Sequence, residues 1–354
     1  AVSPPGEDIV TLGANAASQA LSTQTDAQRQ QIDLLILATE SSVDQSKAAA
    51  IYVHRLLDLN PECRVFETKQ ACYGATGSIA LATSHIKANP DSRALIIAAD
   101  IARYGLGTPG ETTQGAGAAA MVISADPRIL ALDAEAGFHT EDVMDFWRPN
   151  YRSEAIVDGK SSIRIYIKCL LKAWERYQTK VAKAELKRPF DSFAHFCYHL
   201  PFTAMADMAH KQLIKTIGTR RDAQACKEMI ADSQHYNRIV GNTYAASLYV
   251  ALCSLLDHAD AALEHQRIGL FSYGSGCMGE FFSGTVQPGF KSALLTAPHQ
   301  AMLDSRQALS YAEYADFFNY EMPDDGTTCE TPPCETGAYR LSGLRNHKRQ
   351  YTQI

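Results

Sequence analysis

The sequence has little that would place it in a membrane, nucleic-acid or metal-binding class. Its longest apolar runs, at 34–38 and 94–99, are far shorter than the roughly 20 residues of a membrane-spanning helix. Basic residues are not in excess, because 33 Lys and Arg stand against 39 Asp and Glu and the net charge is -6. Such a balance gives no general attraction to nucleic acid or to an anionic membrane. We therefore expect neither as a partner.

Ligand sets for metals and organic cofactors are missing as well. Nine cysteines are scattered without the paired spacing of a zinc site, and no glycine-rich phosphate loop is present. We expect no metal and no tightly held cofactor. Unpaired cysteines, together with no secretory-signal pattern at the start, favour a reducing, cytoplasmic location. Cys329 and Cys334 flank a Pro-Pro turn and are expected to be free thiols on a surface loop rather than a disulfide.

Short apolar runs alternate with helical stretches along the chain, which is the pattern of a layered α/β fold. The first half predicts strands at 34–39, 64–67, 94–99 and 118–124, with helices at 46–57 and 73–87. The second half predicts strands at 193–199 and 268–273, and helices from about residue 203 and over 242–256. Residues 137–160 are expected to form a long loop over the site, and 322–336 an irregular surface excursion.

A strand–Cys–helix unit in one half and a strand–His–helix unit in the other indicate a duplicated fold with its site at the junction. We divide the chain into an N-terminal half (1–130), a connecting region of loops and helix over the site (131–190) and a C-terminal half (191–354).

The segment FETKQACYGAT places Cys72 between a short strand and a helix rich in small residues. A lone cysteine is more often a buried, inert residue. At a helix N-terminus, however, the helix dipole is expected to lower the pKa of the thiol and favour the thiolate needed for acyl transfer. Gly74, Ala75 and Gly77 are expected to leave backbone room for a substrate chain.

The segment ATESSVD places Glu40 directly after an apolar strand. A carboxylate there could simply satisfy backbone amides at a helix start. As a functional group it would be a general base, because a half-buried strand end can raise a carboxyl pKa toward neutrality.

Three further residues lie at strand ends or tight turns in the second half. His199 ends the strand of FCYHLPFTAM, although a lone histidine there is more often structural. Asn242 in VGNTYAAS could orient His199 or a carbonyl group, and backbone amides near Ser275 in SYGSGC could bind an oxyanion. Ordinary turn chemistry explains either of the last two equally well.

Taken together, the segments TESSVD, KQACYGAT, DIARYG, MDFWRP, IVDGKSSI, YHLPF and FSYGSG resemble the hydroxymethylglutaryl-CoA synthase family, in order and over nearly the whole chain. The resemblance implies a thiolase-like duplicated α/β fold with α-β-α-β-α layers and two mixed five-stranded-type sheets. It also implies an acyltransferase of the mevalonate pathway and a homodimer.

The resemblance implies that Cys72 takes an acetyl group from acetyl-CoA and that Glu40 removes a proton from the acetyl methyl. The resulting carbon attacks the ketone of acetoacetyl-CoA, which His199 holds and polarises, and water then releases the product. Four other positions match substrate-contacting residues of the family: Asp100, Tyr104, Asn242 and Ser275.

Two departures from the family pattern keep alternatives open. The family has a strand and helix before the AVSP motif with which this chain opens. Either the numbering starts after an unseen leader or the protein lacks an element that completes one sheet. Ala204 and Met208 stand where lysines often pair with CoA phosphates; the substitutes are Lys211, Arg220 and Arg221.

The second departure favours a family branch that adds a β-branch to acetoacetyl-acyl carrier protein in polyketide assembly, as does the segment CMGEFFSG. The segments DFWRP, IVDGKSSI and NHKRQY favour the mevalonate enzyme. A ketoacyl synthase III-type enzyme would be expected to carry Asn in place of Glu40. A non-catalytic thiolase-fold binding protein would leave Cys72 unacylated.

Overall fold

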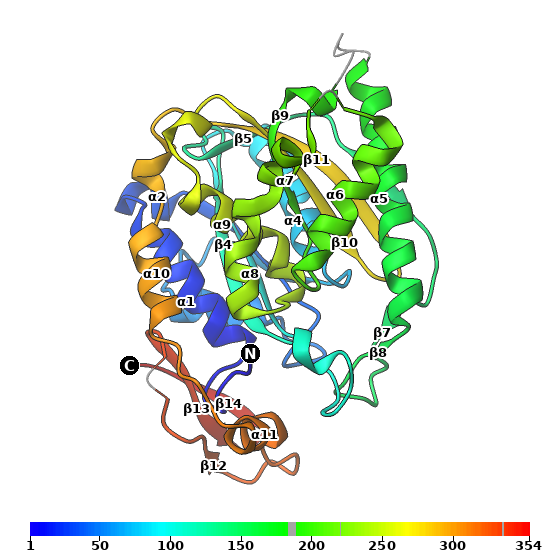
Figure 1. Cartoon of the computed structure of the whole chain (residues 1–354). Coiled ribbons are helices and arrows are strands. Elements are labelled where there is room, and N and C mark those ends of the chain that lie inside the picture. Colours follow the sequence, from blue (N-terminus) through cyan, green and yellow to red (C-terminus); the bar gives the residue numbers. More distant parts are fainter. Residues whose placement is uncertain (183–188, 220, 335) are drawn as a thin grey trace.

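The computed structural model describes residues 1–182, 189–219, 221–334 and 336–354. Two β-sheets are separated by a layer of helices and covered by further helices on their outer faces (Figure 1). This is the α-β-α-β-α order of layers that the sequence predicted. No helix of the described residues combines the length and the apolar character needed to cross a membrane.

The first sheet has four strands in the described part of the chain, where the predicted type has five. Its order is β2-β1-β3-β4, with β1 parallel to both neighbours and β4 antiparallel to β3. Strands buried on both faces are continuous apolar runs, and the last four residues of β1 are fully buried. The strands are β1 (Ile32–Ala38), β2 (Arg64–Thr68), β3 (Arg93–Ile101) and β4 (Ala116–Ile123).

The second sheet has five strands among the described residues, in the order β5-β11-β10-β9 with β6 also paired to β11. β9 runs parallel to β10, whereas β11 is antiparallel to β10, β5 and β6. The strands are β5 (Leu130–Leu132), β6 (Gly137–Thr140), β9 (Phe193–Tyr198), β10 (Arg267–Gly274) and β11 (Met278–Val286).

The middle layer consists of α4 (Gly74–Ala88) and α9 (Ser247–His258), whose apolar faces share one core with β1, β3 and β10. Small residues let α4 approach the first sheet closely, since a Cβ added at Gly74 would lie 3.4 Å from the Cβ of Ala38. Gly74 thus packs α4 against β1. The expectation that the small residues of this helix leave room for a substrate chain stays a prediction.

Outer helices cover the far face of each sheet. On the first sheet they are α1 (Ile9–Ser22) and α3 (Ala49–Leu56); on the second they are α5 (Gly159–Ala182), α6 (Ala204–Ile217) and α7 (Ala223–Ala231). The remaining helices are α2 (Asp26–Gln30), α8 (His235–Val240), α10 (Thr296–Asp304) and α11 (Tyr311–Asn319).

Two regions differ from the sequence prediction. The expected long loop at 137–160 contains β6 and the short pair β7 (Phe146–Trp147) and β8 (Ile156–Val157). The C-terminal residues form a small sheet beside α1 and α3, below the main body in Figure 1, made of β12 (Cys329–Glu330), β13 (Tyr339–Arg345) and β14 (Lys348–Gln353). β12 lies within the predicted irregular excursion, and Cys329 and Cys334 are free thiols as expected.

Candidate active site

The turn before α4 meets the end of β10, so residues of the two halves come together there. A Cβ at Gly274, the last residue of β10, would lie 2.5 Å from the carbonyl oxygen of Gln70 and 2.7 Å from Cβ of Tyr73. Only glycine allows this approach without displacing the turn. Ala71 adopts a left-handed φ of 43°, which is unusual for a residue with a side chain and marks the turn that presents Cys72.

Cys72 and Glu40 are in direct contact. The thiol of Cys72 donates a hydrogen bond to Oε1 of Glu40 across 3.2 Å. Glu40 follows β1 and Cys72 follows β2, which are parallel neighbours, so both chains reach the same edge of the sheet. Two residues that the sequence singled out for acyl transfer and proton abstraction therefore lie together.

The protonation of this pair differs in part from the sequence-based expectation. Burial raises the pKa of Glu40 to about 8, and the negative charge of Asp100 adds to the shift. This agrees with a base of raised pKa. Burial and the adjacent Glu40 carboxylate also raise the pKa of Cys72 well above its ordinary value, so the predicted lowering was wrong. Desolvation and a neighbouring negative charge outweigh the dipole of α4.

Asp100 lies behind Glu40 and is fully buried. Its Oδ1 accepts hydrogen bonds from the hydroxyl of Thr39 (2.8 Å) and the backbone N–H of Glu40 (2.9 Å). Its Oδ2 accepts one from the backbone N–H of Ala245 (2.9 Å). Burial raises the pKa of Asp100 to about 6. Because both of its oxygens accept hydrogen bonds from the protein, Asp100 positions the backbone at Glu40 and the residues before α9. Its contact with substrate stays a prediction.

Asn242 and Tyr104 form a second buried pair beside Cys72. Nδ2 of Asn242 donates to the hydroxyl of Tyr104 (3.1 Å), and Oδ1 accepts from the backbone N–H of Tyr244 (3.0 Å). The Tyr104 ring packs against Phe146 and Tyr244 in a small cluster that Cys72 also contacts. Asn242 thus orders an aromatic wall of the site rather than orienting His199.

The contacts of Asn242 and Asp100 also explain a wrong helix boundary. One helix was expected from residue 242, but 242 and 243 lie outside it, the 3-10 helix η4 (Tyr244–Ala246) follows, and α9 begins at Ser247. The Asn242 side chain holds the N–H of Tyr244, and Asp100 holds that of Ala245, so these two amides are fixed in a tight turn. Side-chain acceptors of this kind compete with helix formation.

His199 lies immediately after β9 and is 3% exposed. Its backbone N–H bonds to the carbonyl of Phe271 on β10 (2.8 Å), and its own carbonyl accepts from the Tyr166 hydroxyl of α5 (2.8 Å). The Tyr166 ring also stacks on the imidazole, with 6.4 Å between centroids. Burial lowers the pKa of His199 to about 3, and Nδ1 has no hydrogen-bond partner in the described part of the chain. The imidazole is therefore neutral, and its Nδ1 is closed off from solvent.

Ser275 lies on the β10–β11 turn, next to the Cys72 turn. Its carbonyl accepts a hydrogen bond from Nε2 of Gln70 (3.4 Å). The next amide, that of Gly276, is bonded to Asp145 Oδ1 (3.0 Å), and the Cys277 amide is bonded to the carbonyl of Glu141. Among the described residues the Ser275 amide has no such acceptor. An oxyanion role is thus open to this amide but not to the two that follow it.

Sequence reasoning missed Asp145, Tyr166 and Arg148. Asp145 is fully buried and anchors the β10–β11 turn, also accepting a hydrogen bond from the Tyr273 hydroxyl (2.6 Å). The positive charges of Arg148 and Lys69 act on Glu40 and partly offset the rise in its pKa. Asp145 and Arg148 belong to the MDFWRP segment, so their position in a distinctive motif was a usable signal.

The residues expected to replace the CoA-binding lysines differ in whether their charged groups are already engaged within the protein. Arg221 donates to the carbonyls of Phe193 (2.8 Å) and Asp191 (3.4 Å), so its guanidinium is engaged in holding the start of β9. Lys211 is exposed on α6. Arg220 lies outside the described residues. No group of three or more His, Cys, Asp and Glu side chains in the described ranges is arranged to hold a metal ion.

The geometry brings a nucleophile and a base of pKa about 8 into contact at one edge of the first sheet, and a neutral imidazole lies at the end of β9 in the second sheet. That set can form a covalent thioester at sulfur and remove a weakly acidic proton from an adjacent carbon.

Comparisons with known proteins agree with this chemistry. Residues 3–128 match the family model described as hydroxymethylglutaryl-coenzyme A synthase N terminal, and residues 130–224 and 208–352 match the corresponding C-terminal model. A hydroxymethylglutaryl-CoA synthase of Enterococcus faecalis is 40% identical over 354 residues, covering 99% of this chain and 88% of the relative. The polyketide 3-hydroxy-3-methylglutaryl-ACP synthase PksG of Bacillus subtilis is 35% identical, covering 89% and 77%.

Solved structures of similar proteins have the same fold. MvaS in complex with 3-hydroxy-3-methylglutaryl coenzyme A superposes with a TM-score of 0.92 at 38% identity, covering all of this chain and 89% of that one. The HMG synthase of the curacin pathway in complex with holo donor-ACP gives 0.90 at 31% identity, covering 100% and 90%.

Proposed function

The chain belongs to the hydroxymethylglutaryl-CoA synthase family, and we propose that Cys72, Glu40 and His199 perform the reaction of that enzyme on acetyl-CoA and acetoacetyl-CoA. The contact between the Cys72 thiol and Glu40 carries the proposal, because it joins the nucleophile to a base whose pKa is about 8. A catalytic base works best when its pKa lies near the working pH.

In the first half-reaction Cys72 attacks the carbonyl carbon of acetyl-CoA. The raised pKa keeps this thiol protonated at rest, so Glu40 accepts its proton as the carbon–sulfur bond forms. The same proton then passes to the departing CoA sulfur, which leaves as a thiol and restores the Glu40 carboxylate. The amide of Ser275 is the candidate donor to the oxyanion of this step.

In the second half-reaction the Glu40 carboxylate removes a proton from the methyl group of acetyl-Cys72. The enolate carbon attacks the ketone carbon of acetoacetyl-CoA, and Glu40 returns its proton to the new alkoxide. His199 is neutral at working pH, so it assists by donating an N–H hydrogen bond to the ketone oxygen and not as an acid. Water then cleaves the thioester and frees the Cys72 thiol.

The surrounding residues set the properties of this machinery. Asp100 raises the pKa of Glu40 by its charge, and Asn242 with Tyr104 forms the wall against Cys72. In this proposal the reaction needs no metal and no resident cofactor, because proton transfers and a covalent thioester account for every bond change.

The CoA enzyme and the polyketide alternative differ in what carries the acetoacetyl group, which is coenzyme A in the first and acyl carrier protein in the second. The 40% identity to the Enterococcus faecalis synthase, against 35% to PksG, supports acetoacetyl-CoA. The test compares turnover of acetoacetyl-CoA with that of acetoacetyl-acyl carrier protein by the same purified protein. Product from acetoacetyl-CoA supports the proposal; turnover of the carrier-protein substrate alone would overturn it.

We also propose a homodimer in the cytoplasm. The support is the thiolase-like fold, whose members pair through the sheet edge near the nucleophile, here β2. Light scattering on the purified protein decides between one and two copies.

A further inference from the structure

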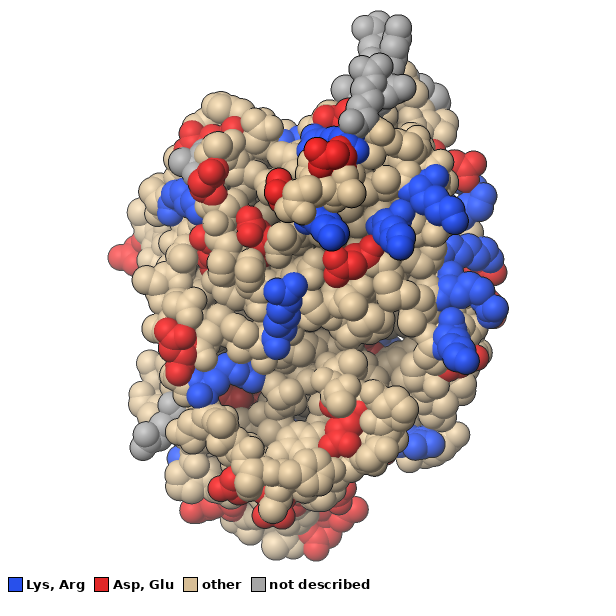
Figure 2. All heavy atoms as spheres, in the orientation of Figure 1, with Lys and Arg blue, Asp and Glu red and all other residues tan. Residues whose placement is uncertain are grey.

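Helix α5 carries a regular row of positive charge that the reaction does not use. Basic residues stand at every fourth position, and we name them the basic stripe: Lys160, Arg164, Lys168, Lys172, Arg176 and Lys180. All six are exposed. Four residues advance a helix by about 40° more than one turn, so the stripe crosses the solvent face diagonally, opposite the side of α5 buried on the second sheet. Figure 2 shows Lys and Arg gathered over the position of α5 in Figure 1.

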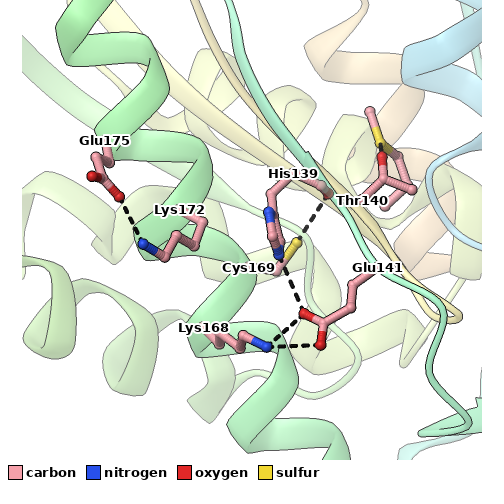
Figure 3. Close-up of polar contacts among 8 residues, drawn as sticks. His139, Thr140, Glu141, Lys168, Cys169, Lys172 and Glu175 are labelled. Carbon is pink, nitrogen blue, oxygen red and sulfur yellow. Dashed lines mark hydrogen bonds and ion pairs between the residues drawn. The ribbon is translucent and has the colours of Figure 1, made fainter.

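The stripe is only partly neutralised. Lys168 bonds both oxygens of Glu141, at 2.5 and 2.8 Å, as Figure 3 shows, and Lys172 pairs with Glu175 at 3.0 Å. In the described part of the chain, Lys160, Arg164 and Arg176 have no ion pair. Like charges four residues apart destabilise a helix. Single contacts such as those of Lys168, Lys172 and Lys180 do not require a row of six like charges, so the regularity of the row favours a binding role.

Two large apolar side chains are exposed beside the stripe. Phe138 is 53% exposed on β6, which lies directly against α5, and the Nζ of Lys180 is 4.3 Å from its ring centre. Met144 is 63% exposed and follows closely after Glu141, the partner of Lys168. Arginine, aromatic residues and methionine are enriched in protein interfaces relative to other surface.

We propose that the basic stripe, with Phe138 and Met144, is a docking surface for a protein that presents an acidic α-helix. Carboxylates at every fourth position of a partner helix would form the matching ridge, since rows of residues four apart are the ridges that interlock in the commonest helix packing. The chain as a whole has a net charge of -6, so an acidic partner is repelled elsewhere and steered to this face.

Other polyanions fit the surface less well. Glu141 and Glu175 interrupt the positive charge, which suits a folded partner with discrete charges better than a continuous phosphate backbone. The inference does not depend on the proposed reaction, because none of these residues is assigned a catalytic or substrate-binding role.

The probe is a labelled peptide as long as α5, with glutamate at every fourth position of an alanine–glutamine helix. The comparison peptide has the same composition with its glutamates in irregular order. Binding to the full chain is measured by fluorescence anisotropy at low salt. The double variant Arg164→Glu/Lys172→Glu alters the stripe, and Lys87→Glu/Lys227→Glu changes two exposed lysines elsewhere by the same net charge.

We expect the regular peptide to bind more tightly than the irregular one, and the stripe variant to lose about tenfold in affinity while the control variant loses little. The stripe variant replaces the Lys172–Glu175 pair by attractive pairs with Lys168 and Arg176, four residues away. Its melting temperature is therefore expected to stay close to that of the parent, and the melting curves show that lost binding does not reflect unfolding. Equal binding to all three proteins would overturn the proposal. So would stripe-dependent binding of phosphatidylglycerol vesicles or single-stranded DNA that exceeds peptide binding.

Discussion

The thiol of Cys72 donates a hydrogen bond to Glu40 at 3.2 Å, and this contact ties the protonation of the nucleophile to that of the base. Burial raises the pKa of both groups, because little solvent is left to stabilise a negative charge on either. The Glu40 carboxylate raises the pKa of Cys72 further, whereas the hydrogen bond from the thiol lowers that of Glu40 and offsets part of its rise. Both groups therefore hold a proton at neutral pH, and removal of one partner changes the protonation of the other.

Replacement of Glu40 by alanine is expected to separate the two half-reactions. Acetyl transfer to sulfur loses its proton acceptor, but the Cys72 thiol also loses the carboxylate that raises its pKa. The larger thiolate fraction offsets part of that loss, so acetylation persists at a reduced rate. Condensation lacks its base and falls by roughly 10²- to 10⁴-fold. Single-turnover acetylation and steady-state synthesis are measured on the same preparation, with Glu62→Ala, an exposed glutamate outside the site, as control. A variant that loses both steps equally would contradict separate roles.

The pH dependence of synthesis is expected to have a single rising limb. The rate increases through a pKa of about 8 as Glu40 loses its proton. No loss of rate from His199 is expected above pH 5, because its pKa of about 3 keeps the imidazole neutral throughout. The measurement is kcat against pH. A second limb near neutrality that disappears in His199→Asn would show that the histidine titrates in the working range.

Stability is expected to fall as pH rises toward 8. The folded chain holds a proton on Glu40 that the unfolded chain releases near its ordinary pKa of 4.5. This contribution to the free energy of unfolding is complete below pH 4.5 and lost as pH rises through about 8, with a size of a few kcal/mol. Glu40→Gln should flatten that part of the slope in urea titrations at several pH values. An unchanged slope would place the titrating group elsewhere.

The substitution Asp100→Asn is expected to move the rising limb to lower pH. The negative charge of Asp100 helps to raise the pKa of Glu40, and the neutral amide of asparagine removes that charge. The amide also has one acceptor oxygen where Asp100 accepts three hydrogen bonds, so about 1–3 kcal/mol of stability is lost. A purely structural role would lower stability and leave the pH midpoint in place, and the kcat profile distinguishes the two.

Gly274→Ala tests the junction of the halves. Its Cβ would lie 2.5 Å from the Gln70 carbonyl, so the turn that carries Cys72 must move. Acetylation is expected to slow by at least about 100-fold, since small misplacements of reacting groups have large effects on rate. Gly159→Ala is the matched control, because no heavy atom lies within 4 Å of its added Cβ. Equal rates in both variants would mean that the turn is not held by β10.

The sequence predicted the parts that depend on local pattern. The buried strands of the first sheet and the positions of Glu40, Cys72 and His199 at strand ends follow from apolar runs and the residues that end them. The pKa of Cys72 could not be predicted this way, because the carboxylate that raises it comes from another strand. The 3-10 form of the helix start at 244–246 was missed for the same reason, since Asp100 holds the Ala245 amide from a distance of 145 residues in the chain.

The most direct test of the account is to trap the acyl intermediate. The protein is incubated with isotopically labelled acetyl-CoA, a sample is analysed by peptide mass spectrometry, and the rest is chased with acetoacetyl-CoA. The account predicts one labelled acetyl group on Cys72, which disappears on the chase as labelled hydroxymethylglutaryl-CoA forms. A label on another residue, or a label on Cys72 that the chase does not convert to product, would contradict it.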